Sequence, residues 1–260
     1  MSHLRLALVQ MDIVDGDPAR NVSRAGQLID TQPGAGVYLL PELWTSGYVH
    51  QQWPAIAKED TPRTLDALQH LATRHQAVIG GTLLSLNDDG KLVNRFWMVD
   101  QGGVMACYDK THLFPPMDEP AYLTPGRSRR RVRVGAWTAA QSICYDLRFP
   151  EMYLRDAVDG ADLFLVPSEW PAERAEALRA LAVARAIETQ SYVAVTNRVG
   201  AAADGTRFGG GSVIVGPGGE IVASAGDTPG IVVGDLDQAR VAAVRGPRPH
   251  FAERRAGVDW

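Results

Sequence analysis

The chain has 260 residues, of which 45% are hydrophobic and 22% charged, and its formal net charge is −4. This is the composition of an ordinary globular protein, and the small negative charge offers no attraction for nucleic acid or an anionic membrane. No apolar run approaches the roughly 20 residues of a membrane-spanning helix, and Met1–Gln10 lacks the features of a signal peptide. Two cysteines, Cys107 and Cys144, make no disulfide framework, so we expect a cytoplasmic protein with free thiols.

The first part of the chain alternates strand and helix patterns. Short apolar runs bounded by Gly, Pro or Asp are typical of strands, and apolar residues at helical spacing indicate helices. Thr61 is expected to cap a helix with Pro62 at its first position. The expected elements, in chain order, are strand Leu4–Gln10, helix Pro18–Thr31, strand Val37–Leu40, helix Pro62–His75, and strands Ala77–Leu86, Val93–Asp100 and Gly103–Tyr108.

The second part continues this alternation and ends with a hairpin. The hairpin lies in GSVIVGPGGEIVASA, and Pro217, Gly218 and Gly219 form its turn. The expected strands are Arg131–Gly135, Trp137–Ile143, Leu163–Val166, Tyr192–Thr196, Gly211–Val215, Glu220–Ser224 and Ile231–Asp235; the expected helices are Pro150–Val158, Glu173–Thr189 and Asp237–Val244.

About twelve strands and five helices interleave in this prediction, with no linker or repeat between them. We therefore expect one α/β domain over residues 1–260. Two sheets stacked face to face with helices outside would hold so many strands. One long twisted sheet would hold them as well, and the residue pattern alone leaves both arrangements open.

Cys144 is the first candidate for chemistry. It follows the predicted strand Trp137–Ile143 and precedes a helix that begins at Pro150. Such a tight connection can expose a nucleophile while backbone N–H groups point toward an incoming oxygen, and a helix N-terminus lowers the pKa of a thiol. The alternative is a buried, inert cysteine of a core strand, which is also how we interpret Cys107.

A nucleophilic cysteine needs a base, and either a histidine or a carboxylate can serve. Among the six histidines, only His112 lies near other suggestive residues, so a Cys–His–Asp arrangement has little support. Glu42 follows an apolar strand and precedes Leu43 and Trp44, so we expect a partly buried acid whose charge a cation balances. Its alternative is a salt bridge at the end of a strand.

Lys110 also follows a predicted strand, and a lysine near the thiol could stabilise an oxyanion. By itself it would more often be a solvated charge. Glu42, Lys110 and Cys144 all stand at the carboxyl ends of predicted strands, where sites in α/β sheets gather. The three residues together therefore favour a catalytic site with a cysteine nucleophile, an acid as base and a lysine.

These segments resemble the nitrilase or carbon–nitrogen hydrolase superfamily. The resemblance rests on Pro41-Glu42, on the run Tyr108–Phe114 and on the run Ile143–Glu151, which occur in that order. Weaker support comes from Trp170-Pro171 with Arg174, from the run Ala184–Gln190, from the run Asn197–Gly200 and from the Gly210–Ser224 hairpin, so that the resemblance covers nearly the whole chain.

The resemblance implies a four-layer α-β-β-α sandwich of two stacked mixed sheets with outer helices. It implies that Glu42 is the general base, Lys110 the oxyanion stabiliser and Cys144 the nucleophile, with the backbone N–H of Tyr145 in the oxyanion hole. The family's second glutamate corresponds best to Glu119, although Asp118 stands beside it. Neither a metal nor an organic cofactor is expected, and the chain lacks a metal motif such as HExxH.

The runs Cys-Tyr-Asp-Leu-Arg-Phe-Pro-Glu, Glu-Trp-Pro and Ala-Arg-Ala-Ile-Glu look most like the omega-amidase branch. Members of that branch hydrolyse 2-oxoglutaramate or 2-oxosuccinamate to a 2-oxo acid and ammonia through a thioester. An N-carbamoyl amino acid hydrolase or a nitrilase of the same superfamily is the alternative, although nitrilases usually carry Cys-Trp-Glu. A non-catalytic binding module with this fold is the alternative from another class.

The small-molecule amide would need a cation for its carboxylate. Arg148 and Arg174 are candidates by position, but Arg148 could instead pair with Asp146 or Glu151. Tyr48, Phe114 and Trp170 could form pocket walls or simply core. Glu169 stands where the family often has Asn, and it would repel an anionic substrate unless it points away.

The sequence also suggests what two parts of the surface do. The basic run Arg127–Arg133 is expected to be a solvated turn and strand edge, and not a nucleic-acid site. By resemblance alone we expect a homodimer, with the helices Pro150–Val158 and Glu173–Thr189 at the interface.

Overall fold

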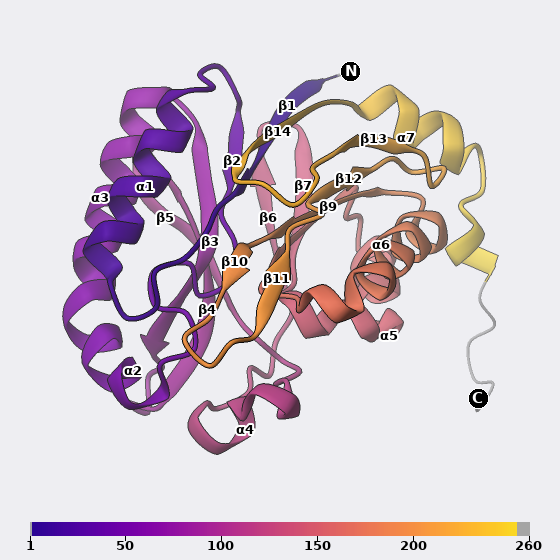
Figure 1. The fold of residues 1–260 in the computed structure, drawn as a ribbon. Helices are drawn as coiled ribbons and strands as arrows, with labels where there is room; N and C mark the ends of the chain where they lie inside the picture. The colour runs from indigo at the N-terminus through magenta and orange to yellow at the C-terminus, as the bar shows by residue number, and fades with distance from the viewer. Residues whose placement is uncertain (1, 254–260) are drawn as a thin grey trace.

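The computed structural model describes residues 2–253, in which two mixed six-stranded sheets stack face to face. Figure 1 shows helices on the outer face of each sheet, which gives four layers in the order α-β-β-α. The predicted fold class is therefore confirmed, and the alternative of one long twisted sheet is wrong. The ends of the predicted domain, residues 1 and 260, lie outside the described residues.

The first sheet has the strand order β14-β1-β2-β3-β4-β5. Its middle strands β1, β2 and β3 are parallel, and the others pair antiparallel. Its strands are β1 (His3–Gln10), β2 (Val37–Leu39), β3 (Val78–Leu86), β4 (Leu92–Asp100), β5 (Gly103–Asp109) and β14 (Gly230–Asp237).

The second sheet repeats this plan with the order β13-β12-β9-β8-β7-β6, and β7, β8 and β9 are parallel. The predicted hairpin around Pro217–Gly219 is confirmed as the antiparallel pair β12 and β13. The strands are β6 (Arg130–Val134), β7 (Trp137–Gln141), β8 (Leu163–Ser168), β9 (Tyr192–Asn197), β12 (Val213–Val215) and β13 (Ile221–Ser224). A separate two-stranded ribbon joins β10 (Val199–Ala201) to β11 (Arg207–Gly209).

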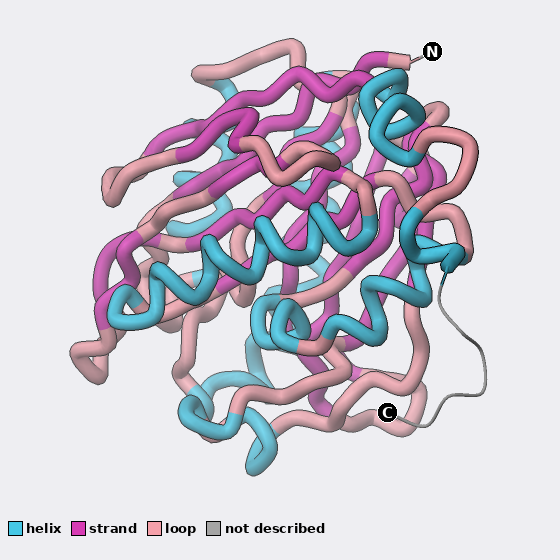
Figure 2. Tube along the Cα trace, turned by 90° about the vertical axis from the view of Figure 1, so that its right-hand side faces the viewer, coloured by secondary structure: helices cyan, strands magenta, loops and turns pink. Residues whose placement is uncertain are grey.

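The helices cover the two outer faces. In Figure 1, α1 (Pro18–Asp30) and α3 (Thr61–His75) lie on the first sheet, and α5 (Pro150–Val158) and α6 (Ala175–Thr189) lie on the second. Figure 2 views the molecule from the side of α5 and α6, whose helices cross in front of the strands. The shorter helices are α2 (Trp53–Ala55), α4 (Glu119–Tyr122) and α7 (Gln238–Arg245).

Strand β1 shows why a nearly continuous apolar run suits this fold. Leu6 and Leu8 are buried in the core between the sheets, whereas Ala7 and Val9 are buried against the helices of the first sheet. Successive side chains of a strand point to opposite faces, so a strand covered on both sides has no polar face. The parallel centre of each sheet is therefore buried on both sides.

Three expectations about local structure are wrong. Thr61 does not cap a helix: it is helical itself, it donates a hydrogen bond to the Leu84 carbonyl, and a π-helical turn, Ile56–Asp60, precedes it. The helix predicted from Glu173 begins at Ala175, after a 3₁₀ turn. The basic run does lie at the strand edge, because β6 is the outermost strand of its sheet, but the expected solvation is wrong for Arg129 and Arg131, which both form ion pairs with Asp156.

The fold brings the carboxyl ends of the parallel strands of both sheets together. The Glu42 backbone N–H, just after β2, donates to the Ser168 carbonyl at the end of β8. The Thr196 hydroxyl on β9 donates to the Leu39 carbonyl on β2. Loops that follow strands of different sheets therefore meet at one place, which is where the predicted site residues stand.

Candidate active site

Cys144 begins a 3₁₀ turn, Cys144–Arg148, three residues after the last residue of β7. Its φ is +42°, a conformation that costs energy for a side chain other than glycine, and the residue is only 4% exposed. Such a sharp turn after a strand presents the side chain while the chain turns away. The predicted place at a strand end is confirmed, but the expected lowering of the thiol pKa by a helix N-terminus is wrong, because burial raises that pKa.

Glu42, Lys110 and Glu119 are buried side chains that contact one another in a row, with the lysine between the two acids. The Lys110 Nζ lies 2.7 Å from Glu42 Oε1 and 2.7 Å from Glu119 Oε1. Glu119 Oε2 accepts the Phe114 backbone N–H at 2.7 Å, which fixes the orientation of that carboxylate. Of the two neighbouring acids, Glu119 therefore contacts the lysine, whereas Asp118 is exposed at the surface.

These contacts set the protonation of the site. Burial raises the pKa of the Cys144 thiol well above its ordinary value; the Glu42 carboxylate raises it further, and Lys110 opposes both. Burial alone would lower the pKa of Lys110, but Glu119 and Glu42 reverse this effect and raise it. Burial also raises the pKa of Glu119 against the opposing effect of Lys110. At neutral pH the site therefore combines a neutral thiol with a charged lysine.

Two contacts that the sequence analysis missed hold Glu42 in place. The Asn94 side-chain amide donates to Glu42 Oε1 at 2.8 Å, and the Glu169 backbone N–H donates to Glu42 Oε2 at 3.0 Å. Asn94 is the third residue of β4, and an amide within this mostly apolar strand was the available signal. The Glu169 contact involves the backbone, so no side-chain pattern could have indicated it.

Asp146 joins the cysteine turn to the segment that carries Lys110. Its Oδ2 accepts the Ile143 backbone N–H and the Tyr108 hydroxyl, and its Oδ1 accepts the His112 backbone N–H. The His112 ring also lies 2.7 Å from Oδ1 and stacks on Phe149. His112 is thus engaged with Asp146, and the Cys144 thiol faces Glu42 instead.

A narrow cavity touches Cys144, and its free volume of about 10 Å³ has room for about one water molecule. Four of the five predicted pocket residues, Phe114, Arg148, Trp170 and Arg174, line it, together with Tyr145 and Pro171. A larger cavity of about 420 Å³ lies next to it and shares Phe114, Pro171 and Arg174.

Arg148 and Arg174 are arranged differently in these walls. The Arg148 guanidinium lies over the rings of Trp170 and Tyr145 and forms no salt bridge with any acid of residues 2–253. The alternative pairing with Asp146 or Glu151 is therefore not formed. Arg174 lies over Phe114, and its Nε is 3.2 Å from the carboxylate of Glu173.

Tyr48 reaches the site from another side. Its hydroxyl donates to Glu119 Oε1 at 2.7 Å, but it does not line the cavity at Cys144. A contact between Tyr48 and substrate stays a prediction.

Among the described residues, no group of three or more His, Cys, Asp or Glu could hold a metal ion, and no helix is both long and apolar enough to span a bilayer.

Comparison with known proteins identifies the family. Residues 5–246 match the family model described as carbon–nitrogen hydrolase. The chain is 38% identical to omega-amidase YafV of Yersinia enterocolitica over 86% of each chain. It is 33% identical to 2-oxoglutaramate amidase of Bacillus subtilis, over 96% of this chain and 97% of the relative. XC1258 of Xanthomonas campestris, a CN-hydrolase superfamily protein with an arsenic adduct in its active site, superimposes with a TM-score of 0.92 at 30% identity over all of both chains.

The chain belongs to the carbon–nitrogen hydrolase family. The resemblance inferred from the three motifs is therefore confirmed, and within the family the similarity to relatives named omega-amidase favours amide hydrolysis over the nitrile and carbamoyl alternatives.

Proposed function

We propose that the protein is an omega-amidase that hydrolyses the terminal amide of a small 2-oxo acid amide, such as 2-oxoglutaramate or 2-oxosuccinamate. The observation that carries this proposal is the buried Glu42–Lys110–Glu119 chain, with 2.7 Å contacts on both sides of the lysine, beside the turn that presents Cys144. The names of the two relatives support the choice of substrate.

In the proposed acylation step, the Cys144 sulfur attacks the amide carbonyl carbon while Glu42 takes the thiol proton. Coupling these events suits a thiol whose pKa is raised by burial, because no free thiolate has to form beforehand. The carbonyl oxygen becomes an oxyanion. Lys110 Nζ has a third N–H beyond its two carboxylate contacts to donate to it, and the Tyr145 backbone N–H is the second proposed donor.

The C–N bond then breaks, Glu42 returns the proton to the leaving nitrogen, and ammonia departs from a thioester on Cys144. Water, deprotonated by Glu42, attacks this thioester; the C–S bond breaks, the 2-oxo acid is released, and Glu42 returns the proton to the Cys144 sulfur. Glu119 orients Lys110 through its 2.7 Å contact and is the other candidate base for the water. The steps balance without a metal or an organic cofactor.

The carboxylate end of the substrate is proposed to meet Arg148. Arg148 lines the cavity at Cys144, and its guanidinium lies on two aromatic rings without an acidic partner among residues 2–253. Arg174 and Phe114 separate this cavity from the larger one beside it. We propose that these two side chains move when substrate reaches Cys144, and that Trp170 forms a wall.

The direct test is an ammonia-release screen over omega-amides, N-carbamoyl amino acids and nitriles, with Cys144→Ala as the control. Turnover of 2-oxo acid amides that is lost in the variant supports the proposal. Ammonia from a carbamoyl compound or a nitrile, with none from the oxo-amide, would assign another branch. A protein inactive toward every compound, with a Cys144 that resists a thiol alkylator, would favour a non-catalytic module.

We further propose a cytoplasmic homodimer. On the outer helix α6 the large apolar side chain of Ile187 is 49% exposed, which suits a helix that another subunit covers. Light scattering of the wild type and of Ile187→Asp tests this state. A dimer that the substitution weakens supports the proposal, and a wild-type monomer would contradict it.

A further inference from the structure

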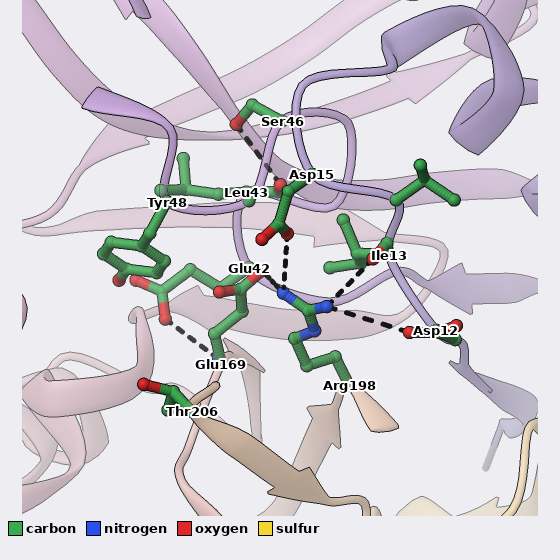
Figure 3. Close-up of polar contacts among 12 residues, drawn as sticks. Asp12, Ile13, Asp15, Glu42, Leu43, Ser46, Tyr48, Glu169, Arg198 and Thr206 are labelled. Carbon is green, nitrogen blue, oxygen red and sulfur yellow. Dashed lines mark hydrogen bonds and ion pairs between the residues drawn. The ribbon is translucent and has the colours of Figure 1, made fainter. Parts of the chain in front are cut away.

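Arg198 is a fully buried guanidinium between β9 and β10 that the proposed reaction does not use. Figure 3 shows the polar groups that surround the Arg198 guanidinium. Its Nη2 donates to the Ile13 carbonyl at 2.9 Å, and its Nη1 lies 3.3 Å from both Asp15 Oδ1 and Glu169 Oε1. The opposite face of the guanidinium lies 4.5 Å from the Phe208 ring centre. Arg198 therefore joins the loops that follow β1, β8 and β9.

Glu169 connects this guanidinium to the candidate base. Its side chain is fully buried and turned to Arg198, while its backbone N–H donates to Glu42 Oε2 at 3.0 Å. The next residue is fixed as well, because the Trp170 backbone N–H donates to Asn197 Oδ1 at 2.7 Å. The Glu169 side chain therefore adds a contact with Arg198 beside the backbone N–H that holds Glu42.

The charges around Glu169 fit a holding role. Four groups face it: Arg198 after β9, Glu42 after β2, Asp15 after β1 and Tyr48 in the loop beyond Glu42. Burial raises the pKa of Glu169 to about 8, and Arg198 opposes the shift without cancelling it. A protonated Glu169 keeps its contact with Arg198 and adds no second negative charge beside Glu42. Its other oxygen, Oε2, is buried and finds no hydrogen-bond partner in residues 2–253.

We infer that Glu169, anchored by Arg198, is a positioning residue for Glu42: the length of its side chain, and not its charge, sets the N–H that orients the base. The inference rests on the proposed role of Glu42. It also assigns Glu169 a direction, away from the substrate and toward Arg198, so an anionic substrate does not meet its carboxylate.

Two conservative variants separate length from charge. Glu169→Gln keeps the length and an oxygen acceptor for Arg198, so its kcat at pH 7 should stay within about 3-fold of the wild type. Glu169→Asp keeps the acid but shortens the side chain by one methylene. Either the backbone N–H of residue 169 must then move, or the contact with Arg198 must lengthen. Since small misplacements at an active site cost up to about 100-fold in rate, we expect kcat to fall at least about 10-fold while KM changes by less than about 3-fold. Glu59→Asp, an exposed acid in the π-helical turn Ile56–Asp60 and outside the proposed subunit interface, is the matched control.

Each variant is also measured by the rate at which acrylamide alkylates Cys144 across pH 6–10, with folding checked by circular dichroism. This rate depends on the base and not on the identity of the substrate. A slower reaction in Glu169→Asp than in Glu169→Gln supports the inference, even if the wild type hydrolyses none of the amides tested and the proposed function fails. An active wild type with unchanged kcat and alkylation in Glu169→Asp would overturn it. A rise in KM alone, in either variant, would also overturn it, because that result indicates contact with substrate.

Discussion

At the scale of single residues, the charge balance around Lys110 explains why the proposed base is a carboxylate. Lys110 has two buried acids at 2.7 Å, Glu42 and Glu119, so a single cation faces two acids. Burial raises the pKa of Cys144, which keeps the thiol neutral before substrate arrives. Such a thiol needs an adjacent proton acceptor, and Glu42 lies in that place.

The Arg148 guanidinium, which forms no ion pair within residues 2–253, leads to a prediction about substrate affinity. Arg148→Met keeps much of the side-chain packing on Trp170 and Tyr145 but removes the charge. The loss of one charged hydrogen bond, about 1.5–3 kcal/mol, corresponds to about a 10- to 100-fold rise in KM for an amide that carries a carboxylate. Steady-state kinetics with a charged and an uncharged amide measure this effect.

The uncharged amide should show little change in KM, and Arg240→Met serves as the control because Arg240 pairs with Glu220 at the surface. An equal rise in KM for the charged and the uncharged amide would mean that Arg148 acts through packing and not through the substrate carboxylate.

At the scale of elements, the site is held together by links between loops. The segments with Glu42, Lys110 and Cys144 could be predicted because each follows a recognisable strand and carries chemistry in its side chain. The links could not be predicted. Asp146 binds backbone N–H groups of two segments, and Arg198 binds carboxylates that are distant in the chain. Only the three-dimensional structure shows which of the many charged residues meet.

Asp146→Asn tests the link between the cysteine turn and the lysine segment. The carboxylate accepts from two backbone N–H groups and the Tyr108 hydroxyl, and an amide NH₂ group cannot replace Oδ2 as an acceptor. Unmade buried hydrogen bonds cost about 1–3 kcal/mol each, so thermal unfolding should occur several degrees lower. Asp30→Asn, on an exposed ion pair, is the control and should change Tm by less. An equal fall in Tm in Asp146→Asn and Asp30→Asn would contradict the proposed link.

At the scale of the whole molecule, two similar halves explain where the site lies. Each sheet has three parallel central strands, and the stacking of the sheets brings the ends of β2, β7, β8 and β9 together. The alternation of strands and helices indicated the α/β class. The residue pattern could not distinguish two stacked sheets from one, because strands buried on both faces have no polar side to orient them. The family motifs supplied that choice.

The buried Glu169 predicts how stability depends on pH. Its folded pKa of about 8 lies above the ordinary value near 4.5, so the folded state holds a proton that the unfolded state releases between these values. The contribution of this group is present below pH 4.5 and is lost as the pH rises through 8. Glu169→Gln cannot release a proton, so its Tm relative to the wild type should be higher at pH 9 than at pH 6. Calorimetry that finds the same difference at both pH values would contradict the raised pKa.

The central claim is that Cys144 forms a thioester with the acyl part of a small amide. The most direct measurement is mass spectrometry of the protein quenched during turnover of 2-oxoglutaramate, followed by digestion to locate the adduct. We predict a 2-oxo acyl group on the peptide that contains Cys144, together with released ammonia, and neither in Cys144→Ala. Ammonia release without an adduct on Cys144, or continued release by Cys144→Ala, would contradict the account.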